Sequence, residues 1–314
     1  MYYPYFRGKQ FELVLLREMS EFIASQPINP VIELVKDNPS SIQRVLGSLI
    51  NQEANFTIVI NPLYGELIGK QTKILDFIEQ FVPTDYEKIS LGYIAGPNTD
   101  VKHLTQTIRN GKRENYTIIH YGYTDGQNLS KETNRSDRVK THIFIDGYTS
   151  KLYQRHFRAD GVERVLIRDG FRLRRNEDYP PSDHFSDLHI THTDEGVEGF
   201  GDFLIVGDEY REAGGPAYAI AIHLTYLDME DDMFVRHFIS DRTGSPLDPA
   251  GKFLEALEKL VAELDGPRTL LFCSDACKEY RDLFERSHFP GLGYVKKLSM
   301  QHHMELLADF LSRT

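Results

Sequence analysis

Polar and charged residues recur directly after short apolar runs in this sequence of 314 residues. The first run, residues 2–6, is followed by the segment RGKQFE, which contains Arg7, Lys9 and Gln10. Later runs end in, or are followed by, side chains that can bind charge or transfer protons: Glu33, Asn61, His120, Asp146, Arg168 and Asp169. In a parallel barrel the carboxyl ends of the strands meet at one mouth, where active sites lie. We therefore expect these residues to share one site.

This set contains the groups that phosphoryl chemistry uses. Its acidic members are predicted to hold a divalent metal ion, Mg²⁺ or Mn²⁺, that activates a water molecule: Glu33, Asp146 and Asp169. A cationic side chain would neutralise the charge that develops on phosphate, and His120 is the predicted proton donor. The predicted catalytic residues are therefore Lys9, Glu33, His120, Asp146 and Arg168.

A second group of residues is predicted to bind the ligand rather than to react with it. Residues 151–175 hold eight Lys or Arg against three Asp or Glu, within a chain of net charge −11. The fork geometry of a guanidinium suits phosphate, although a basic cluster can also simply solvate a surface. The predicted ligand-binding residues are Arg7, Gln10, Asn61, Arg174 and Arg175.

The order of apolar runs indicates how these residues are positioned. Eight runs recur with starts 23 to 38 residues apart, the spacing of a strand followed by a helix: residues 2–6, 31–35, 56–60, 89–94, 116–121, 141–146, 164–168 and 202–206. The runs are almost continuously apolar, as in a parallel sheet that is covered on both faces. Amphipathic segments such as 11–26 and 70–81 lie between them. The pattern predicts an α/β fold, a (β/α)8 TIM-like barrel over residues 1–210, with a doubly wound open sheet as the competing architecture.

The last hundred residues have a different pattern. Residues 217–226 and 233–240 flank the acidic turn LDMEDD and predict an antiparallel hairpin. A helix is predicted over 249–264 and a further strand over 268–273. Residues 211–314 are therefore expected to form a C-terminal α+β appendage that packs on the barrel, and a candidate surface for a protein partner.

Composition limits the classes of function. The net charge of −11 disfavours a surface that attracts nucleic acid or an anionic membrane as a whole, so a phosphate site must be a local pocket. No apolar run approaches the roughly 18 residues that a membrane span requires. The N-terminus lacks the pattern of a signal peptide, and Cys273 and Cys277 are too few for a disulfide framework. These features predict a cytoplasmic protein.

The N-terminal pattern resembles that of a known group of proteins. The segment YYPYFRGKQFELVLLRE followed by VIELV is similar to the start of the bacterial and phage-associated "beta protein" families, with Lys9, Gln10, Glu12, Ile32 and Glu33 in the matching positions. Later segments, among them GFGDFLIVGDEY, are similar to a longer branch of that group. This resemblance implies the fold and the chain extent, and a context of mobile-element or antiviral defence genes, but no established activity.

A partial likeness to the glycerophosphodiester phosphodiesterases rests on Arg7, Gly8 and Glu33. The histidine that precedes Arg-Gly in those barrels is Phe6 here, and their second acidic ligand is Val35. The leading hypothesis is a barrel that binds a phosphate-bearing ligand, a nucleotide or a nucleic-acid end, and that acts as a metal-dependent phosphodiester hydrolase. The alternative is a non-enzymatic, partner-binding subunit of a larger bacterial complex.

Overall fold

The computed structural model describes residues 1–212, 215 and 217–313. The chain divides into two compact units. The first contains Met1–Arg168 and Thr191–Asp202, and the second contains Asp169–Ile190 and Phe203–Thr314.

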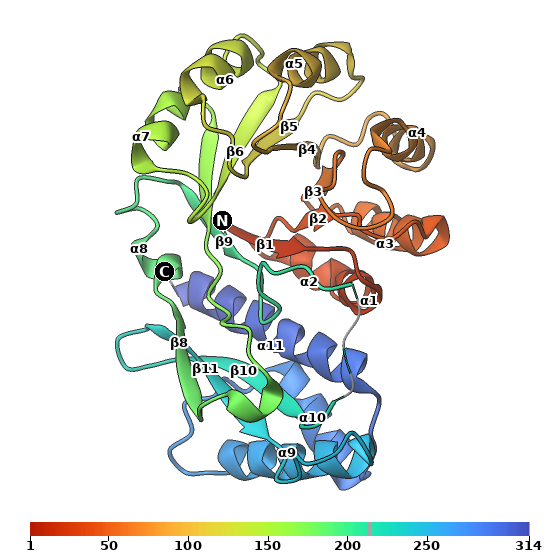
Figure 1. Ribbon diagram of the computed structural model, residues 1–314, viewed down its shortest axis with the longest axis vertical. Coiled ribbons are helices and arrows are strands. Elements are labelled where there is room, and N and C mark those ends of the chain that lie inside the picture. The colour runs from red at the N-terminus through yellow and green to blue at the C-terminus, as the bar shows by residue number, and fades with distance from the viewer. Residues whose placement is uncertain (213–214, 216, 314) are drawn as a thin grey trace. The chain divides into compact units, whose positions relative to one another are not determined.

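The first unit is a closed barrel of parallel strands (Figure 1). In their order around the barrel the strands are β1 (Tyr2–Phe6), β2 (Val31–Glu33), β3 (Phe56–Val59), β4 (Ile89–Ala95), β5 (Tyr116–His120), β6 (Val139–Ile145), β7 (Glu163–Ile167) and β9 (Gly199–Asp202). Strand β9 pairs with both β7 and β1 and so closes the sheet. The predicted (β/α)8 barrel is confirmed, and the open sheet is excluded.

The last barrel strand lies earlier in the chain than predicted. The sequence pattern indicated residues 202–206, whereas β9 ends at Asp202 and Leu204 has a positive φ of 52°. A Cβ atom on Gly201 would lie 2.1 Å from the carbonyl oxygen of Tyr3, so the close approach of β9 to β1 requires glycine at this position. Glycine has a low strand propensity, and the segment GFGD therefore carries no strand signal in the sequence.

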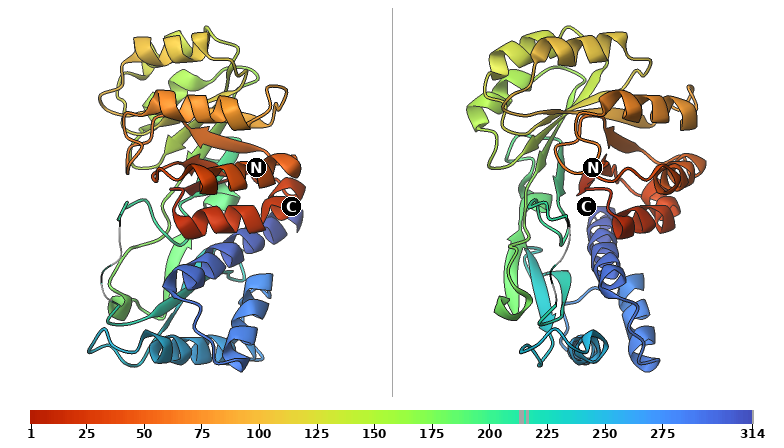
Figure 2. Two further views of the ribbon diagram at one scale, coloured as in Figure 1. Left: turned by 90° about the vertical axis from the view of Figure 1, so that its right-hand side faces the viewer. Right: turned by 45° about the vertical axis from the view of Figure 1, so that its right-hand side comes forward.

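Helices cover the outside of the barrel (Figures 1 and 2). They are α1 (Gln10–Glu18), α2 (Ser20–Ser25), α3 (Pro39–Asn51), α4 (Gln71–Phe81), α5 (Val101–Asn110), α6 (Gly126–Thr133), α7 (Lys151–Gln154) and the 3-10 helix η1 (Arg155–Phe157). The segment predicted as one helix over 11–26 is interrupted at Met19. Its apolar stripe is nevertheless buried as predicted, as Leu13, Leu16 and Ile23 show.

Two sets of contacts show which side chains point into the barrel. The hydroxyl of Tyr3 on β1 hydrogen-bonds Glu163 on β7, two strands away, so both side chains lie in the interior. Because side chains alternate along a strand, Tyr5 also points inward. His120 instead contacts Tyr153 and Phe157 of the helical layer and therefore points outward.

The second unit combines a three-stranded antiparallel sheet with helices. Its strand order is β10 (Ala221–Leu227), β11 (Met233–Ile239) and β8 (Ser182–Ser186). Its helical elements are η2 (Asn176–Asp178), α8 (Leu188–Thr191), α9 (Pro249–Leu264), α10 (Asp275–Glu285) and α11 (Leu292–Arg313); α8 ends at the junction with the first unit. The predicted hairpin and the helix over 249–264 are confirmed, whereas residues 268–273 form no strand.

The boundary between the units also differs from the single division at residue 210 that the sequence pattern indicated. Strand β8 pairs with β11, some 50 residues further along the chain, with Arg236 opposite Ser182. This pairing places residues 169–190 in the second unit, together with the predicted ligand residues Arg174 and Arg175. Among the described residues, no helix is both long and apolar enough to cross a membrane.

Candidate functional site

A buried ion pair lies where β1 and β2 end. Glu33 is the last residue of β2, and Arg7 follows β1 directly. The Nε atom of Arg7 lies 3.2 Å from Oε2 of Glu33, and the side chains are only 5% and 1% exposed. The hydroxyl of Tyr5 donates to Oε2 at 3.0 Å, and the backbone N–H of Leu63 donates to Oε1 at 2.6 Å. Glu33 is thus held as a buried carboxylate at the carboxyl end of the strands.

The surroundings of Glu33 have opposite effects on the pKa of its carboxyl. Burial raises the pKa of the Glu33 carboxyl, while Arg7, the backbone N–H of Leu63 and the hydroxyl of Tyr5 lower it. The net pKa is raised, so the protonated form of Glu33 is easier to reach than for an exposed glutamate. The guanidinium of Arg7 also lies 4.6 Å from the centre of the Tyr64 ring. This arrangement suits a group that gives and takes a proton.

Arg7, which was predicted to bind the ligand, is the cation that pairs with Glu33. Lys9 is half-buried at the N-terminus of α1, where its backbone N–H donates to Glu12. Burial is the largest influence that lowers the pKa of the Lys9 ammonium; Glu12 raises it, and the positive charges of Arg7 and Lys36 lower it further. Arg7 and Lys36 therefore lie close enough to Lys9 to act on its charge, while Arg7 pairs with Glu33 and Lys36 pairs with Glu66 at 3.1 Å.

Gly8 allows this close arrangement. Its φ is +59°, and a Cβ atom there would lie 3.0 Å from the carbonyl oxygen of Glu33. Any other residue would be strained in this backbone conformation and would crowd the end of β2.

A second group of charges lies at the ends of β6 and β7. Arg168 donates from Nε to Oδ2 of Asp146 at 2.7 Å and from Nη2 to Oε1 of Glu195 at 3.0 Å. Lys151 also pairs with Glu195, and this pair is the first cause of the lowered pKa of the Glu195 carboxyl. Asp146 and Arg168, both predicted as catalytic residues, thus form an ion pair. These side chains are partly exposed, as expected at a barrel mouth.

Two tyrosines that the sequence pattern did not indicate follow the ends of β5 and β6. Tyr121 directly follows β5 and Tyr148 follows β6 by three residues. Their rings stack with centroids 4.2 Å apart and an angle of 25° between the planes. Tyr148 is 47% exposed. The signal was available, since each tyrosine follows a strand end, but single aromatic residues in loops are common.

His120 does not lie in the mouth. Its Nδ1 is 2.7 Å from the hydroxyl of Tyr153 and its Nε2 is 2.9 Å from Nδ1 of His142. Both imidazoles are buried, and burial lowers the pKa of each. Because its side chain points outward into the helical layer, His120 cannot reach a ligand in the mouth. The prediction of His120 as proton donor there is wrong.

The three predicted metal ligands do not come together. Asp169 belongs to the second unit, where its carboxylate accepts from the backbone N–H groups of Phe171 and Asp208. Glu33 is neutralised by Arg7, and Asp146 by Arg168. Among residues 1–212, 215 and 217–313, no group of three His, Cys, Asp or Glu is placed to hold a metal ion. These three side chains do not fit the predicted Mg²⁺ or Mn²⁺ site.

The remaining predicted ligand residues have other surroundings. Asn61 bonds both the N–H and the carbonyl of Ile94, which ties β3 to the end of β4. Gln10 is exposed at the start of α1. In the second unit, Arg174 pairs with Asp183 and Arg175 pairs with Glu177. Arg7 differs from these predicted ligand-binding residues, because it contacts Glu33 at the mouth.

No protein-family model matches the sequence, and no curated protein matches it. Among solved structures, N-acetylneuraminate lyase from Mycoplasma synoviae is 9% identical with a TM-score of 0.40, covering 65% of this chain and 67% of that chain. A putative dihydrodipicolinate synthase family protein from Coccidioides immitis is 7% identical with a TM-score of 0.41, covering 64% and 65%. D-psicose 3-epimerase, in the presence of D-fructose, is 9% identical with a TM-score of 0.38, covering 68% and 86%.

These likenesses are partial and carry no argument about a reaction or a substrate. The barrel is established instead by its own strand order and by the parallel pairing of every neighbouring strand. Any function must therefore be argued from the residues at the mouth.

Proposed function

We propose that the barrel binds a phosphate-bearing ligand, a nucleotide or a nucleic-acid end, at the mouth formed by the ends of β1 and β2. The observation that carries this proposal is the gathering of three cations in a chain of net charge −11. The positive charges of Arg7 and Lys36 both lower the pKa of the half-buried Lys9 ammonium, while Arg7 pairs with Glu33 and Lys36 with Glu66. A bound anion would add a partner for the Lys9 ammonium.

The start of α1 adds to this preference for an anion. Lys9 is the residue from which α1 begins, and the N-terminus of a helix carries a partial positive charge. Gly8 lets the backbone approach a ligand closely. Lys9 and the helix terminus would thus act on the same phosphate, with Arg7 behind them.

Hydrolysis of a phosphodiester is the reaction that Glu33 could serve. Water would attack the phosphorus as the bond to the leaving oxygen breaks, and the Glu33 carboxyl, whose pKa is raised, would donate its proton to that oxygen. Arg7 would stabilise the carboxylate until it takes up the proton that the attacking water releases. A metal ion, if the reaction uses one, would have to be held by the ligand's own phosphate together with residues other than the predicted triad.

Binding is tested by calorimetric titration with inorganic phosphate and with a dinucleotide. Lys9→Ala should weaken both by about tenfold or more, the loss expected for one charge-assisted hydrogen bond. Lys140→Ala is the matched control, because Lys140 is an exposed lysine near the opposite end of the barrel strands. Equal affinity of the wild-type protein and Lys9→Ala would refute binding at this mouth.

Catalysis is tested separately with the dinucleotide thymidylyl-thymidine, whose alkoxide leaving group needs a proton, with and without added Mg²⁺ or Mn²⁺. Glu33→Gln should reduce its cleavage by about 100-fold if Glu33 is the proton donor. Phosphate binding without any turnover would support the alternative of a non-enzymatic binding subunit.

A further inference from the structure

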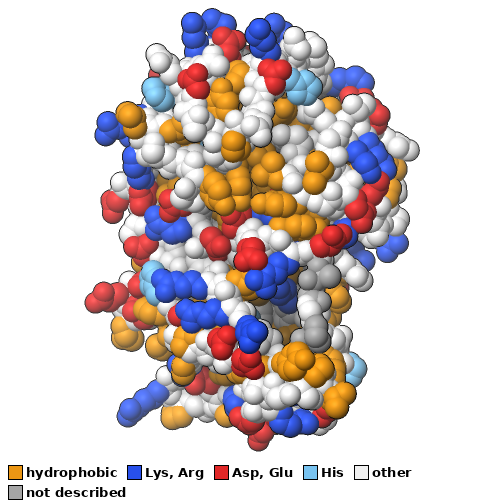
Figure 3. Space-filling model, in the orientation of Figure 1, with side chains coloured by type: hydrophobic (Ala, Val, Ile, Leu, Met, Phe, Trp, Pro, Cys, Tyr) orange, Lys and Arg blue, Asp and Glu red, His pale blue; other side chains and the backbone are white. Residues whose placement is uncertain are grey.

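The strongest feature that the proposed function leaves unused is the Tyr121–Tyr148 stack. Figure 3 shows that hydrophobic side chains, a class that includes tyrosine there, gather over the barrel on one face of the molecule. A half-exposed aromatic stack at the carboxyl ends of two strands lies where barrel proteins bind ligands.

The backbone that carries the two rings is hydrogen-bonded to the ends of the strands. The N–H of Tyr121 donates to the carbonyl of Ala95 at 2.9 Å, and that of Tyr148 donates to the carbonyl of Ile145 at 3.2 Å. Gly122 has a φ of +94°, and a Cβ atom there would lie 3.9 Å from the Tyr148 ring. The stack is therefore attached to strand ends, and a ligand would not have to order it on binding.

We propose that the Tyr121–Tyr148 stack is a base-binding subsite, so that the phosphate-bearing ligand of this barrel is a nucleotide. This inference rests on the proposed function. Each of the nucleobases has a π face that stacks on tyrosine. Inorganic phosphate and a simple phosphate ester have no such face. The subsite would thus select for a base without strong preference among bases.

The order of the strands separates the tyrosine stack from the cations around the barrel. In the closed barrel β5 is four strands from β1, and β6 is four strands from β2, in either direction. The stack and the three cations therefore lie on opposite sides of the same mouth. A nucleotide carries its base and its phosphate at opposite ends of a sugar, so a nucleotide that spans the mouth would place one end on each side.

The test compares the affinities of AMP, UMP, ribose 5-phosphate and adenosine by calorimetry. The wild-type protein should bind AMP and UMP about 5- to 150-fold more tightly than ribose 5-phosphate, the range for one stacked base. Tyr148→Ala should bring this ratio close to one and leave the affinity for inorganic phosphate unchanged, while Tyr148→Phe should keep the ratio.

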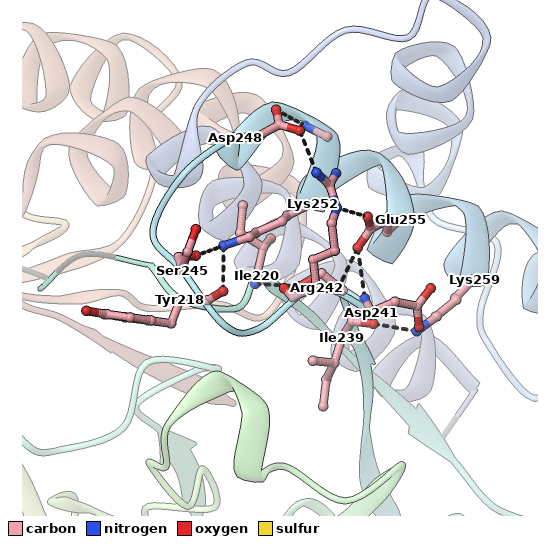
Figure 4. Close-up of polar contacts among 12 residues, drawn as sticks. Tyr218, Ile220, Ile239, Asp241, Arg242, Ser245, Asp248, Lys252, Glu255 and Lys259 are labelled. Atoms are coloured by element: carbon pink, nitrogen blue, oxygen red, sulfur yellow. Dashed lines mark hydrogen bonds and ion pairs between the residues drawn. The ribbon is translucent and has the colours of Figure 1, made fainter.

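Tyr218→Ala is the matched control. Tyr218 lies in the second unit and is 49% exposed, close to the value for Tyr148. Figure 4 shows its ring directed away from the polar network in which its backbone carbonyl accepts from Lys252. Its removal should leave all four affinities unchanged.

The outcomes separate this inference from the proposed function. Equal binding of AMP and ribose 5-phosphate by the wild-type protein, or an unchanged ratio in Tyr148→Ala, overturns the base subsite while phosphate binding stands. Equal binding of adenosine and AMP overturns the phosphate site and leaves the stack as an aromatic-ligand site. No detectable binding of AMP overturns both.

Discussion

Replacement of Arg7 by methionine should destabilise the barrel strongly, because it leaves a carboxylate buried without its cation. Arg7 and Glu33 are 4% and 1% exposed as residues. After the change, Glu33 would keep the hydrogen bonds from Tyr5 and Leu63 but would lose its ion pair. Removal of one partner of a buried pair costs about 3–5 kcal/mol. Methionine keeps the length and apolar stem of the side chain, so little of this loss should come from packing.

The loss of stability in Arg7→Met should depend on pH in a defined direction. Burial already raises the pKa of Glu33 above its ordinary value of 4.5, and Arg7 is the largest influence in the opposite sense. In Arg7→Met the pKa should rise further. A carboxyl with a raised pKa in the folded state binds more protons folded than unfolded, so stability falls as pH rises from the unfolded pKa to the folded one. The deficit relative to wild type should therefore be small near about pH 4 and complete at about pH 8.

The assay is urea unfolding at several pH values, followed by far-UV circular dichroism and by tyrosine fluorescence, since the chain contains no tryptophan. Arg17→Met is the control, because Arg17 is 40% exposed and its pair with Glu18 spans 3.6 Å. Its loss should cost no more than about 1 kcal/mol. The double change of Arg7→Met with Glu33→Gln should recover much of the stability. A deficit in Arg7→Met that is independent of pH, or that persists in full in the double variant, would refute the ion-pair account.

Two further predictions concern the rest of the barrel. Burial lowers the pKa of His142 to about 3, so the neutral ring contributes stability that is complete above its ordinary pKa of 6.5 and is lost as pH falls toward 3. Between about pH 7.5 and 5 this residue should account for a loss of about 2 kcal/mol, and His142→Gln, compared with wild type by urea unfolding at both pH values, should show a weaker dependence. Deletion of residues 1–8 should abolish soluble expression, because β1 pairs with both β2 and β9 and its loss opens the barrel; a soluble truncation with native circular dichroism would contradict the structural role of β1.

The repeat of apolar runs was sufficient to predict the barrel. Continuous apolar strands separated by amphipathic helices leave few alternatives for burying both faces of a sheet. The same repeat showed that polar residues gather at strand ends, and it located Arg7, Glu33 and Asp146 correctly. Such patterns are local, and short stretches of sequence determine them.

Tertiary structure decided which of those residues meet. When both faces of a strand are buried, the apolar pattern does not show which face points inward, so the outward direction of His120 became visible only from its contact with Tyr153. The strand β9 could not be recognised in the sequence because it contains glycines, which allow it to pack closely against Tyr3.

The placement of residues 169–190 likewise depends on the pairing of β8 with β11, two strands that are distant in sequence. That pairing assigns Asp169, Arg174 and Arg175 to the second unit rather than to the barrel. The free energy that fixes these contacts comes from surfaces brought together only in the folded chain, and no local pattern of residues encodes it.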